Sequence, residues 1–323
     1  MKKYISTFLR IFNLWYSVDS PIYRPIKIKM KTTFIFIAIV IALSACSIKQ
    51  EKTKQASTID STLQNKVASI MEGKLKEFGA QSGYVLIMDV KTGQIIASYG
   101  KATSTPYRSE LVRLATLSAA LKTGKVHLND TVDTGNGICI VDKDTLFDHN
   151  WHRGGYGKLT VRQAFAQSSV VGNYKMAVKA FGDNKEEYFN KVRNIYSMIS
   201  DTTSTIVFAN HVEWATITPM LTLTFVNEIA ASTGNDSLKS ALRYAVTNGL
   251  GVKANTGKTE VAGISGTTRQ ENGSYLAEFC GYYPFSNPQY SIIVTIHKKD
   301  IPVSGGAMAG NVFREIVEYM ITE

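Results

Sequence analysis

The sequence is poor in cysteine and in long apolar runs. The first scarcity excludes a framework of several disulfides, and the second argues against a membrane-spanning helix. Its three cysteines, Cys46, Cys139 and Cys280, allow at most one disulfide, and the unlike surroundings of the last two favour buried free thiols instead. The longest apolar run, 34–43, has ten residues. A bilayer takes about 20, so this run is not a spanning helix. The sequence shows no internal repeat and no low-complexity segment, which leaves one large globular domain or two ordinary ones.

The charge balance gives no sign of a nucleic-acid partner. The formal net charge is +10, but the first 45 residues hold seven Lys or Arg and one Asp, which accounts for +6. Residues 46–323 therefore carry only 10 − 6 = +4. This mild excess implies no particular partner, and none is predicted among nucleic acids.

The N-terminal segment has the pattern of a secretion signal. Lys29 and Lys31 precede the apolar run, which ends at Leu43-Ser44-Ala45-Cys46. That ending resembles the lipobox of bacterial lipoproteins, which implies removal of residues 1–45 and acylation of Cys46. The alternative is that Cys46 is an ordinary small residue at a cleavage site.

The residues around this signal predict where the protein is held. Residues 1–29 precede a second possible start at Met30 and lack the signal pattern, which indicates an over-extended start. Residues 46–60 are polar and unpatterned and are predicted to tether the lipid to a domain over 61–323. We expect the protein in a bacterial cell envelope, lipid-anchored on the periplasmic side, and Ser47 favours the outer membrane.

The first part of the domain predicts a helix, a hairpin and a second helix. Apolar residues recur at helical spacing from Ser61 to Phe78. The strings GYVLIMDV and QIIASYG flank a turn and predict a β-hairpin over residues 83–100. A second helix is predicted after Ser109, a natural N-cap, and before Gly124.

The remainder predicts a helical block and then antiparallel strands. A Gly-rich loop over 134–158 leads to a capping box at 160–163, and the helix that it opens breaks at 167–169 before another that ends at Gly182. The strings LAEFCGYY and YSIIVTIHK predict strands, and a last helix starts at about residue 307. This order indicates an α+β fold with an antiparallel sheet flanked by helices and an all-helical block.

Three motif-like strings carry little weight. Residues 251–259 have five residues between glycines where a phosphate-binding loop has four, so a turn between strands is favoured over nucleotide binding. Asp148, His149 and His152 lack a clear fourth metal ligand, so no metal or other cofactor is predicted. Ser98 and Lys101 have Ser-x-x-Lys spacing at a strand end, where their side chains point to opposite faces.

Five blocks in a fixed order carry a family resemblance over most of residues 60–323. They are DVKTGQIIASYG, RLATLSAALKTGKVHLNDTVDTGNG, LTVRQAFAQSSVVGNYKMAVKAFG, ATITPMLTLTFVNEIAASTG and LRYAVTNGLGVKANTGKTEVAGISGTT. Together they resemble the transpeptidase domain of penicillin-binding proteins and the related serine β-lactamases. The resemblance implies a β-lactamase/transpeptidase-like fold and acyl transfer through a serine ester.

The resemblance implies three motifs, and the first is altered here. A Ser-x-x-Lys at a helix start supplies nucleophile and base, but an alignment without a gap places Glu110 and Arg113 at these positions. Glutamate forms no comparable stable ester, and arginine stays protonated. A shift by one residue puts Ser109 at the nucleophile position but Val112 at that of the lysine. Ser109 is therefore read as an N-cap, with an atypical nucleophile as the alternative.

The other two motifs each keep a hydroxyl and lose a substrate-binding group. Ser168 matches the serine of the family's Ser-x-Asn, while Val170 replaces the asparagine. Ile264-Ser265-Gly266-Thr267 matches the family's Lys-Thr/Ser-Gly strand, with isoleucine in place of the cation that binds the substrate carboxylate. Asn173, one helical turn further on, is a weak substitute for the lost amide.

These departures favour a domain that has lost catalysis. Loss of the nucleophile alone in a serine hydrolase costs on the order of 10⁶ in turnover, and here the base, amide and cation differ too. We expect a binding or accessory module of cell-wall biology, with the peptidoglycan stem peptide or wall-synthesis proteins as partners and the membrane reached through the lipid. The alternative is an active D,D-transpeptidase or β-lactam-acylating enzyme that uses Ser109 or Ser168 as an atypical nucleophile.

Overall fold

The computed structural model describes residues 60–101, 106–182, 184–197, 207–208 and 215–322. The predicted signal segment, Cys46 and all of the tether before residue 60 lie outside these ranges. Residues Thr58–Glu323 form one compact unit that contains two large hydrophobic cores and a small third one, so we expect this unit to fold by itself. Within the described ranges, no helix is both long enough and apolar enough to cross a membrane.

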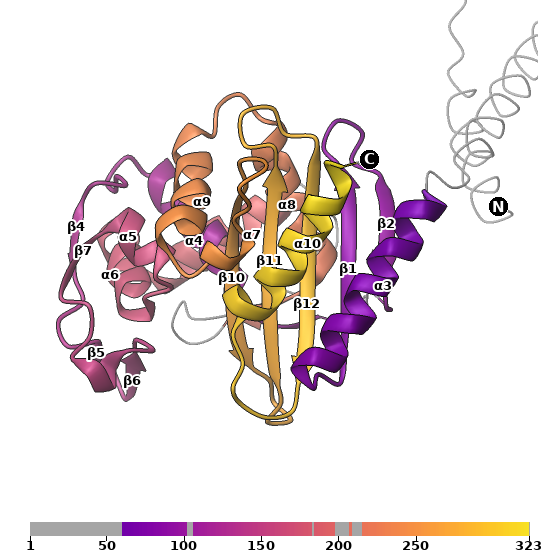
Figure 1. Ribbon diagram of the computed structural model, residues 1–323. Helices are drawn as coiled ribbons and strands as arrows, with labels where there is room; N and C mark the ends of the chain where they lie inside the picture. Colours follow the sequence, from indigo (N-terminus) through magenta and orange to yellow (C-terminus); the bar gives the residue numbers. More distant parts are fainter. Residues whose placement is uncertain (1–59, 102–105, 183, 198–206, 209–214, 323) are drawn as a thin grey trace, which may run out of the picture. The chain divides into compact units, whose positions relative to one another are not determined.

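The centre of the domain is an antiparallel sheet of five strands in the order β10-β11-β12-β1-β2 (Figure 1). The strands are β1 (Ser82–Asp89), β2 (Ile95–Tyr99), β10 (Ala262–Arg269), β11 (Tyr275–Tyr283) and β12 (Tyr290–Lys298). The predicted hairpin forms β1 and β2, and β1 also pairs with β12 in continuous register from Ser82↔His297 to Asp89↔Tyr290. The first and last thirds of the sequence therefore share one sheet.

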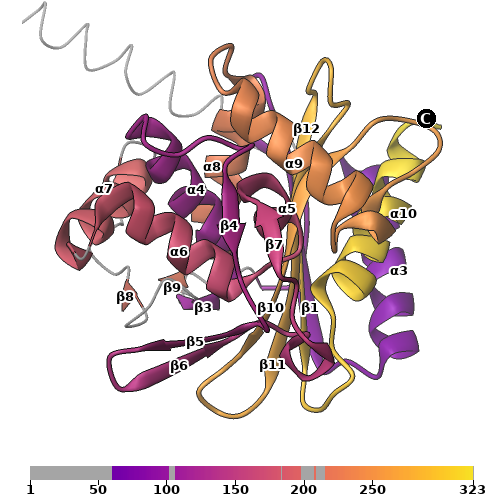
Figure 2. The same ribbon diagram turned by 90° about the vertical axis from the view of Figure 1, so that its left-hand side faces the viewer.

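Each face of the sheet is covered by a different set of helices (Figures 1 and 2). Side chains alternate along β1, so Val85 and Ile87 join one core while Leu86 and Met88 join the other. The first core lies under α3 (Ser61–Phe78) and α10 (Gly310–Met320). The second core lies under a block of helices. This arrangement confirms the predicted α+β fold.

The helical block contains α4 (Arg113–Lys122), α5 (Val161–Ala166), α6 (Val170–Phe181), α7 (Lys185–Ser197), α8 (Pro219–Ala231) and α9 (Asp236–Asn248). The predicted capping box opens α5, with both of its hydrogen bonds between Thr160 and Gln163 present. The predicted break separates α5 from α6, and Gly182 ends α6. Helices α7 and α9 were not among the predicted elements.

Three sequence predictions are wrong in detail. The loop predicted over 134–158 contains a β-hairpin, β5 (Ile138–Val141) and β6 (Asp144–Phe147), and a 3₁₀ turn, η2 (Trp151–Arg153). Strand β4 (Thr131–Asp133) leads into this region and pairs with β7 (Lys158–Thr160) behind it. Residues 251–259 were predicted to form a turn between two strands. They instead connect helix α9 to strand β10 through the 3₁₀ turn η4 (Val252–Ala254). Cys280 is a buried free thiol as predicted, but the free thiol of Cys139 is half-buried.

Candidate functional site

The candidate site lies where a short strand runs into α4. This strand, β3 (Tyr107–Ser109), pairs with β9 (Ala215–Ile217), which also pairs with β8 (Val207–Phe208). From Ser109 the chain passes through one 3₁₀ turn, η1 (Glu110–Val112), directly into α4. The Ser109 hydroxyl accepts a hydrogen bond from the Leu111 N–H at 3.1 Å, so the predicted N-cap is confirmed, on η1.

Glu110 bridges this turn to β10. Its backbone N–H donates to the Thr268 hydroxyl at 3.1 Å, and its carboxylate accepts the backbone N–H of Thr267 at 3.2 Å. Gly266 leaves room for this approach, since a Cβ added there would lie 3.5 Å from the Cβ of Glu110 and 3.1 Å from a methyl of Leu111. The Glu110 side chain therefore occupies the strand edge that faces the start of α4.

Arg113 fills the space behind Glu110. Its guanidinium donates to the backbone carbonyl of Ser265 and, at 3.3 Å, to that of Glu110, and it lies 3.8 Å from the Glu110 carboxylate. It also lies 5.9 Å from the centre of the Phe165 ring of α5. Burial lowers the pKa of Arg113 to about 10, which still leaves it protonated at neutral pH. The position predicted for the base is thus occupied by a buried cation that bonds to the backbone of its own chain.

Strand β10 directs its two remaining hydroxyls away from Glu110. The Thr267 hydroxyl accepts the N–H of Gly305, which opens the π-helical turn η5 (Gly305–Ala309) before α10. Ser265 is buried, and a Cβ added to Gly306 would lie 3.6 Å from its hydroxyl. Ile264, which the resemblance aligns with the family's cation, is 1% exposed and belongs to the core under the helical block.

A buried carboxylate joins the site from β11. Glu278 pairs in register with Gly266, and its two oxygens accept the hydroxyls of Ser109 and Tyr107, each at 2.7 Å. The Tyr84 hydroxyl donates in turn to that of Tyr107 at 2.8 Å. Burial raises the pKa of Glu278 to about 7, against the two hydrogen bonds and Arg113, which lower it.

Sequence reasoning missed this carboxylate, although a signal was present. Glu278 stands inside the apolar string LAEFCGYY, and a charged residue in a strand buried on both faces needs a partner. In the structure those partners are the two hydroxyls of β3, those of Tyr107 and Ser109. The strand pattern alone could not show which segments would supply them.

The second motif lies between α5 and α6. Ser168 is half-buried and has φ +53°, a left-handed conformation that is uncommon for serine. Val170 packs against the hairpin β5–β6, and Asn173 is buried on α6. Hydrogen bonds from Glu110, Arg113 and Thr267 connect the start of α4 to β10. The structure therefore joins the first and third motifs more tightly than the second.

Asp148 and the neighbouring histidines have structural contacts. The buried Asp148 carboxylate accepts the Ser169 hydroxyl at 2.9 Å and the Val171 N–H at 3.0 Å, at the start of α6. The Tyr156 hydroxyl lies 3.0 Å from Nε2 of His149. Among the described residues, no group of three or more His, Cys, Asp or Glu side chains is placed to hold a metal ion.

The comparison with known families decides the chain's membership. The family of the penicillin binding protein transpeptidase domain matches residues 83–318. The chain belongs to this family. A curated relative, the probable peptidoglycan D,D-transpeptidase PbpC of Pseudomonas aeruginosa, is 26% identical over 345 aligned positions that cover 84% of this chain. The alignment spans 60% of that relative's own length.

Two solved structures show the same fold. The domain of Burkholderia pseudomallei penicillin-binding protein 3 superposes with a TM-score of 0.69 and is 20% identical, covering 83% of this chain and 96% of that one. A peptidoglycan glycosyltransferase from Burkholderia ambifaria gives a TM-score of 0.67 at 21% identity, with coverage of 82% and 96%. At this level of identity the structures support the fold alone.

The contacts around position 110 can be compared with what acyl transfer requires. An acyl transferase needs a nucleophile, a base and N–H donors aimed at the developing oxyanion. The N–H groups that flank position 110, those of Glu110 and Thr267, already donate to the Thr268 hydroxyl and the Glu110 carboxylate. At the position predicted for the base stands Arg113, which is protonated at neutral pH. The N–H groups of Glu110 and Thr267 are thus both engaged within the chain.

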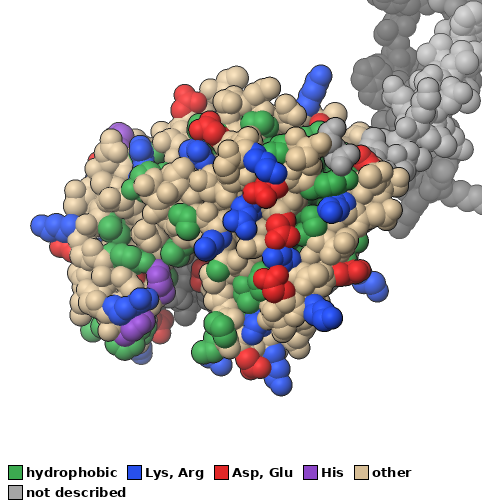
Figure 3. Space-filling model, in the orientation of Figure 1, with side chains coloured by type: hydrophobic (Ala, Val, Ile, Leu, Met, Phe, Trp, Pro, Cys, Tyr) green, Lys and Arg blue, Asp and Glu red, His purple; other side chains and the backbone are tan. Residues whose placement is uncertain are grey.

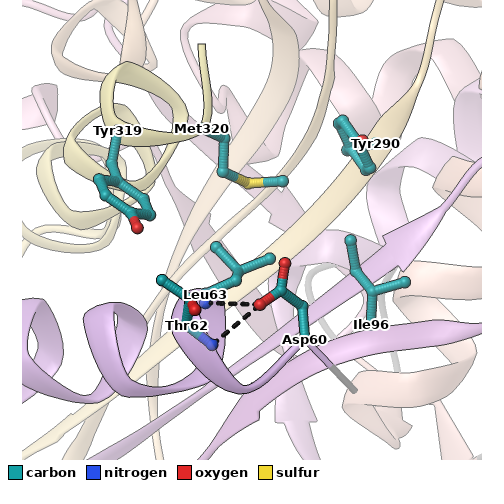
Figure 4. Close-up of a pocket in the computed structure, with 7 residues that line it drawn as sticks. All are labelled: Asp60, Thr62, Leu63, Ile96, Tyr290, Tyr319 and Met320. Atoms are coloured by element: carbon teal, nitrogen blue, oxygen red, sulfur yellow. Dashed lines mark hydrogen bonds between the residues drawn. The ribbon is translucent and has the colours of Figure 1, made fainter. Parts of the chain in front are cut away.

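A separate pocket of about 410 Å³ lies at the start of α3 (Figure 4). Its walls include Tyr290, Tyr319 and Met320, and Asp60 stands at its edge. One oxygen of the Asp60 carboxylate accepts the N–H groups of Thr62 and Leu63, so this residue is the N-cap of α3. The pocket shares no residue with the three motifs.

Proposed function

We propose that the domain is a catalytically inactive member of the transpeptidase family that serves peptidoglycan biology as a binding or accessory module. The observation that supports this most strongly is the Glu110 carboxylate on the N–H of Thr267, backed by the buried Arg113. A carboxylate in this place both replaces the nucleophile and occupies a donor that an acyl oxyanion would need.

The proposal includes a place in the cell and a class of partner. The relative from Pseudomonas aeruginosa is named a probable peptidoglycan D,D-transpeptidase, which supports a role next to the cell wall. We place the domain in the cell envelope, held by the lipid on Cys46 that the lipobox-like sequence predicts. Its partners are the stem peptide of peptidoglycan or proteins of wall synthesis.

One observation favours the alternative of an active enzyme. The Ser109 hydroxyl lies 2.7 Å from the Glu278 carboxylate, whose pKa of about 7 suits a general base. Both residues are, however, 0% exposed, and the Ser109 hydroxyl also caps η1. A substrate cannot reach this pair without separating β3 from β11, so we favour the inactive module.

Rebuilding the first motif tests the proposal. The double substitution Glu110→Ser with Arg113→Lys supplies a nucleophile and a base and frees the N–H of Thr267. We expect a fluorescent penicillin to label this variant slowly, since Val170 and Ile264 remain, and to leave the wild type unlabelled. Equal labelling of both, abolished by Ser109→Ala, would establish the active enzyme instead.

A further inference from the structure

The hairpin β5–β6 has one face in the core and one in solvent. Its inner side chains Val141 and Leu146 pack with Val171 of α6. The register pairs Ile138 with Phe147 and Ile140 with Thr145, and cross-strand partners share a face. The outer face is therefore built from side chains that contribute nothing to the small core beneath the hairpin.

This outer face is apolar and exposed. Ile140 is 77% exposed, Phe147 45% and Trp151, which follows on η2, 46%. The rings of Phe147 and Trp151 lie 5.4 Å apart and form one continuous surface with the half-buried Ile138. Exposed apolar groups that gather in this way mark interaction sites more often than those scattered singly. We call Ile138, Ile140, Phe147 and Trp151 the hairpin patch.

The strands beneath the patch also keep unpaired edges. Among the strands that the structure describes, β5 and β6 pair with each other alone, so each has one edge without a strand partner. An exposed edge of this kind can accept an extended segment of another chain through backbone hydrogen bonds. Such a segment would place alternate side chains on the hairpin patch.

The exposed charges around the patch are mostly basic, although Asp144 of β6 is acidic and exposed. Lys143 in the turn, Arg153 on η2 and Lys158 on β7 are exposed, and none of them makes an ion pair within the described part of the chain. The nearby Asp142 is already paired with Lys185 at 2.8 Å. Apolar, basic and histidine side chains gather over this end of the domain (Figure 3). The surroundings therefore favour an acidic partner.

A protein segment fits this surface better than a bilayer does. The chain enters the domain at α3, on the opposite side from the hairpin (Figures 1 and 2). A lipid anchor before α3 thus gives no reason for the hairpin to lie at the membrane. In addition, an unpaired strand edge offers backbone N–H and C=O groups, which the acyl chains of a lipid cannot pair.

We propose that the hairpin patch docks an extended segment of a partner protein that carries alternating apolar side chains and acidic flanks. This inference adds a binding surface to the proposed accessory module. It rests on that proposed function only in taking the partner to be a protein. It involves no residue of the three motifs, so it can fail while the conclusion on lost catalysis stands.

The test is selection of a display library of short linear peptides on the unit from residue 58 to 323. We expect enriched peptides with alternating apolar residues and acidic flanks. The substitution Ile140→Thr should weaken their binding by about tenfold or more, as removal of a central apolar anchor does. Ile301→Thr is the matched control, because Ile301 is 71% exposed outside the patch.

Three results would overturn the proposal. The first is that no peptide is enriched, and the second is that the enriched peptides bind Ile140→Thr and Ile301→Thr equally. The third is that the unit sediments with vesicles of anionic lipid through Ile140 while ignoring acidic peptides, which would make the patch a membrane contact. Because Ile140 is exposed, its substitution is not expected to prevent folding.

Discussion

Replacing Ile264 by lysine is expected to lower the free energy of unfolding by on the order of 4 kcal/mol, the cost of a buried lysine whose pKa is shifted by about 3 units. The side chain is 1% exposed in the core under the helical block. The guanidinium of Arg113 already donates a hydrogen bond to the backbone carbonyl of Ser265, the residue that follows Ile264. A second cation would therefore meet both apolar surroundings and a like charge. Urea denaturation measures the loss.

The control for this substitution is Ile264→Met, which keeps the site apolar and should cost less than about 1.5 kcal/mol. If Ile264→Lys is also within about 1 kcal/mol of the wild type, the side chain at this position reaches solvent. A solvent-filled cleft would then run between β10 and α4. That result would weaken the account of a closed site.

The pH dependence of stability is expected to report the charge of Glu278. Its pKa is about 7 in the folded domain against an ordinary value of 4.5, so the folded state holds the proton more tightly. The stabilisation is fully present below pH 4.5 and is lost as the pH rises to about 7. The total is about 3 kcal/mol, from roughly 1.4 kcal/mol per pKa unit.

Glu278→Gln keeps the shape and cannot ionise, so its unfolding free energy should not show this fall. The measurement is denaturant unfolding of both proteins across the same pH range. Glu72→Gln on the exposed face of α3 is the control and should follow the wild type. Parallel curves for Glu278→Gln and the wild type would show that Glu278 stays ionised in the fold, which contradicts the burial argument.

Much of the fold follows from local sequence signals. The helix over Ser61–Phe78, the hairpin β1–β2 and the capping box of α5 all carry a periodicity or a polar cap that needs no tertiary information. The hairpin β5–β6 lacked such a signal. Its turn is Asp142-Lys143, and Asp142 adopts φ +55° without the Asn-Gly or Asp-Gly pair that usually marks a two-residue turn.

The sequence predicts which residues stand at the motif positions of the site, but not which contacts their side chains make. The sequence alone places Glu110, Arg113, Val170 and Ile264 at motif positions, and residue chemistry argues against catalysis there. What the sequence could not give is where the new side chains point. The hydrogen bond between Glu110 and Thr267 joins residues 157 positions apart in the sequence, and the one between Ser109 and Glu278 joins residues 169 positions apart. Contacts of this range depend on the register of β10 and β11.

The measurement that tests the central claim most directly is the intact mass of the unit 58–323 after incubation with a reactive penicillin. An active transpeptidase of the family in the same tube serves as the positive control. The account predicts that the control gains the mass of one penicillin while the wild-type unit keeps its own mass. A wild-type adduct that disappears in the double substitution Ser109→Ala with Ser168→Ala would contradict it, and would assign catalysis to one of these two serines.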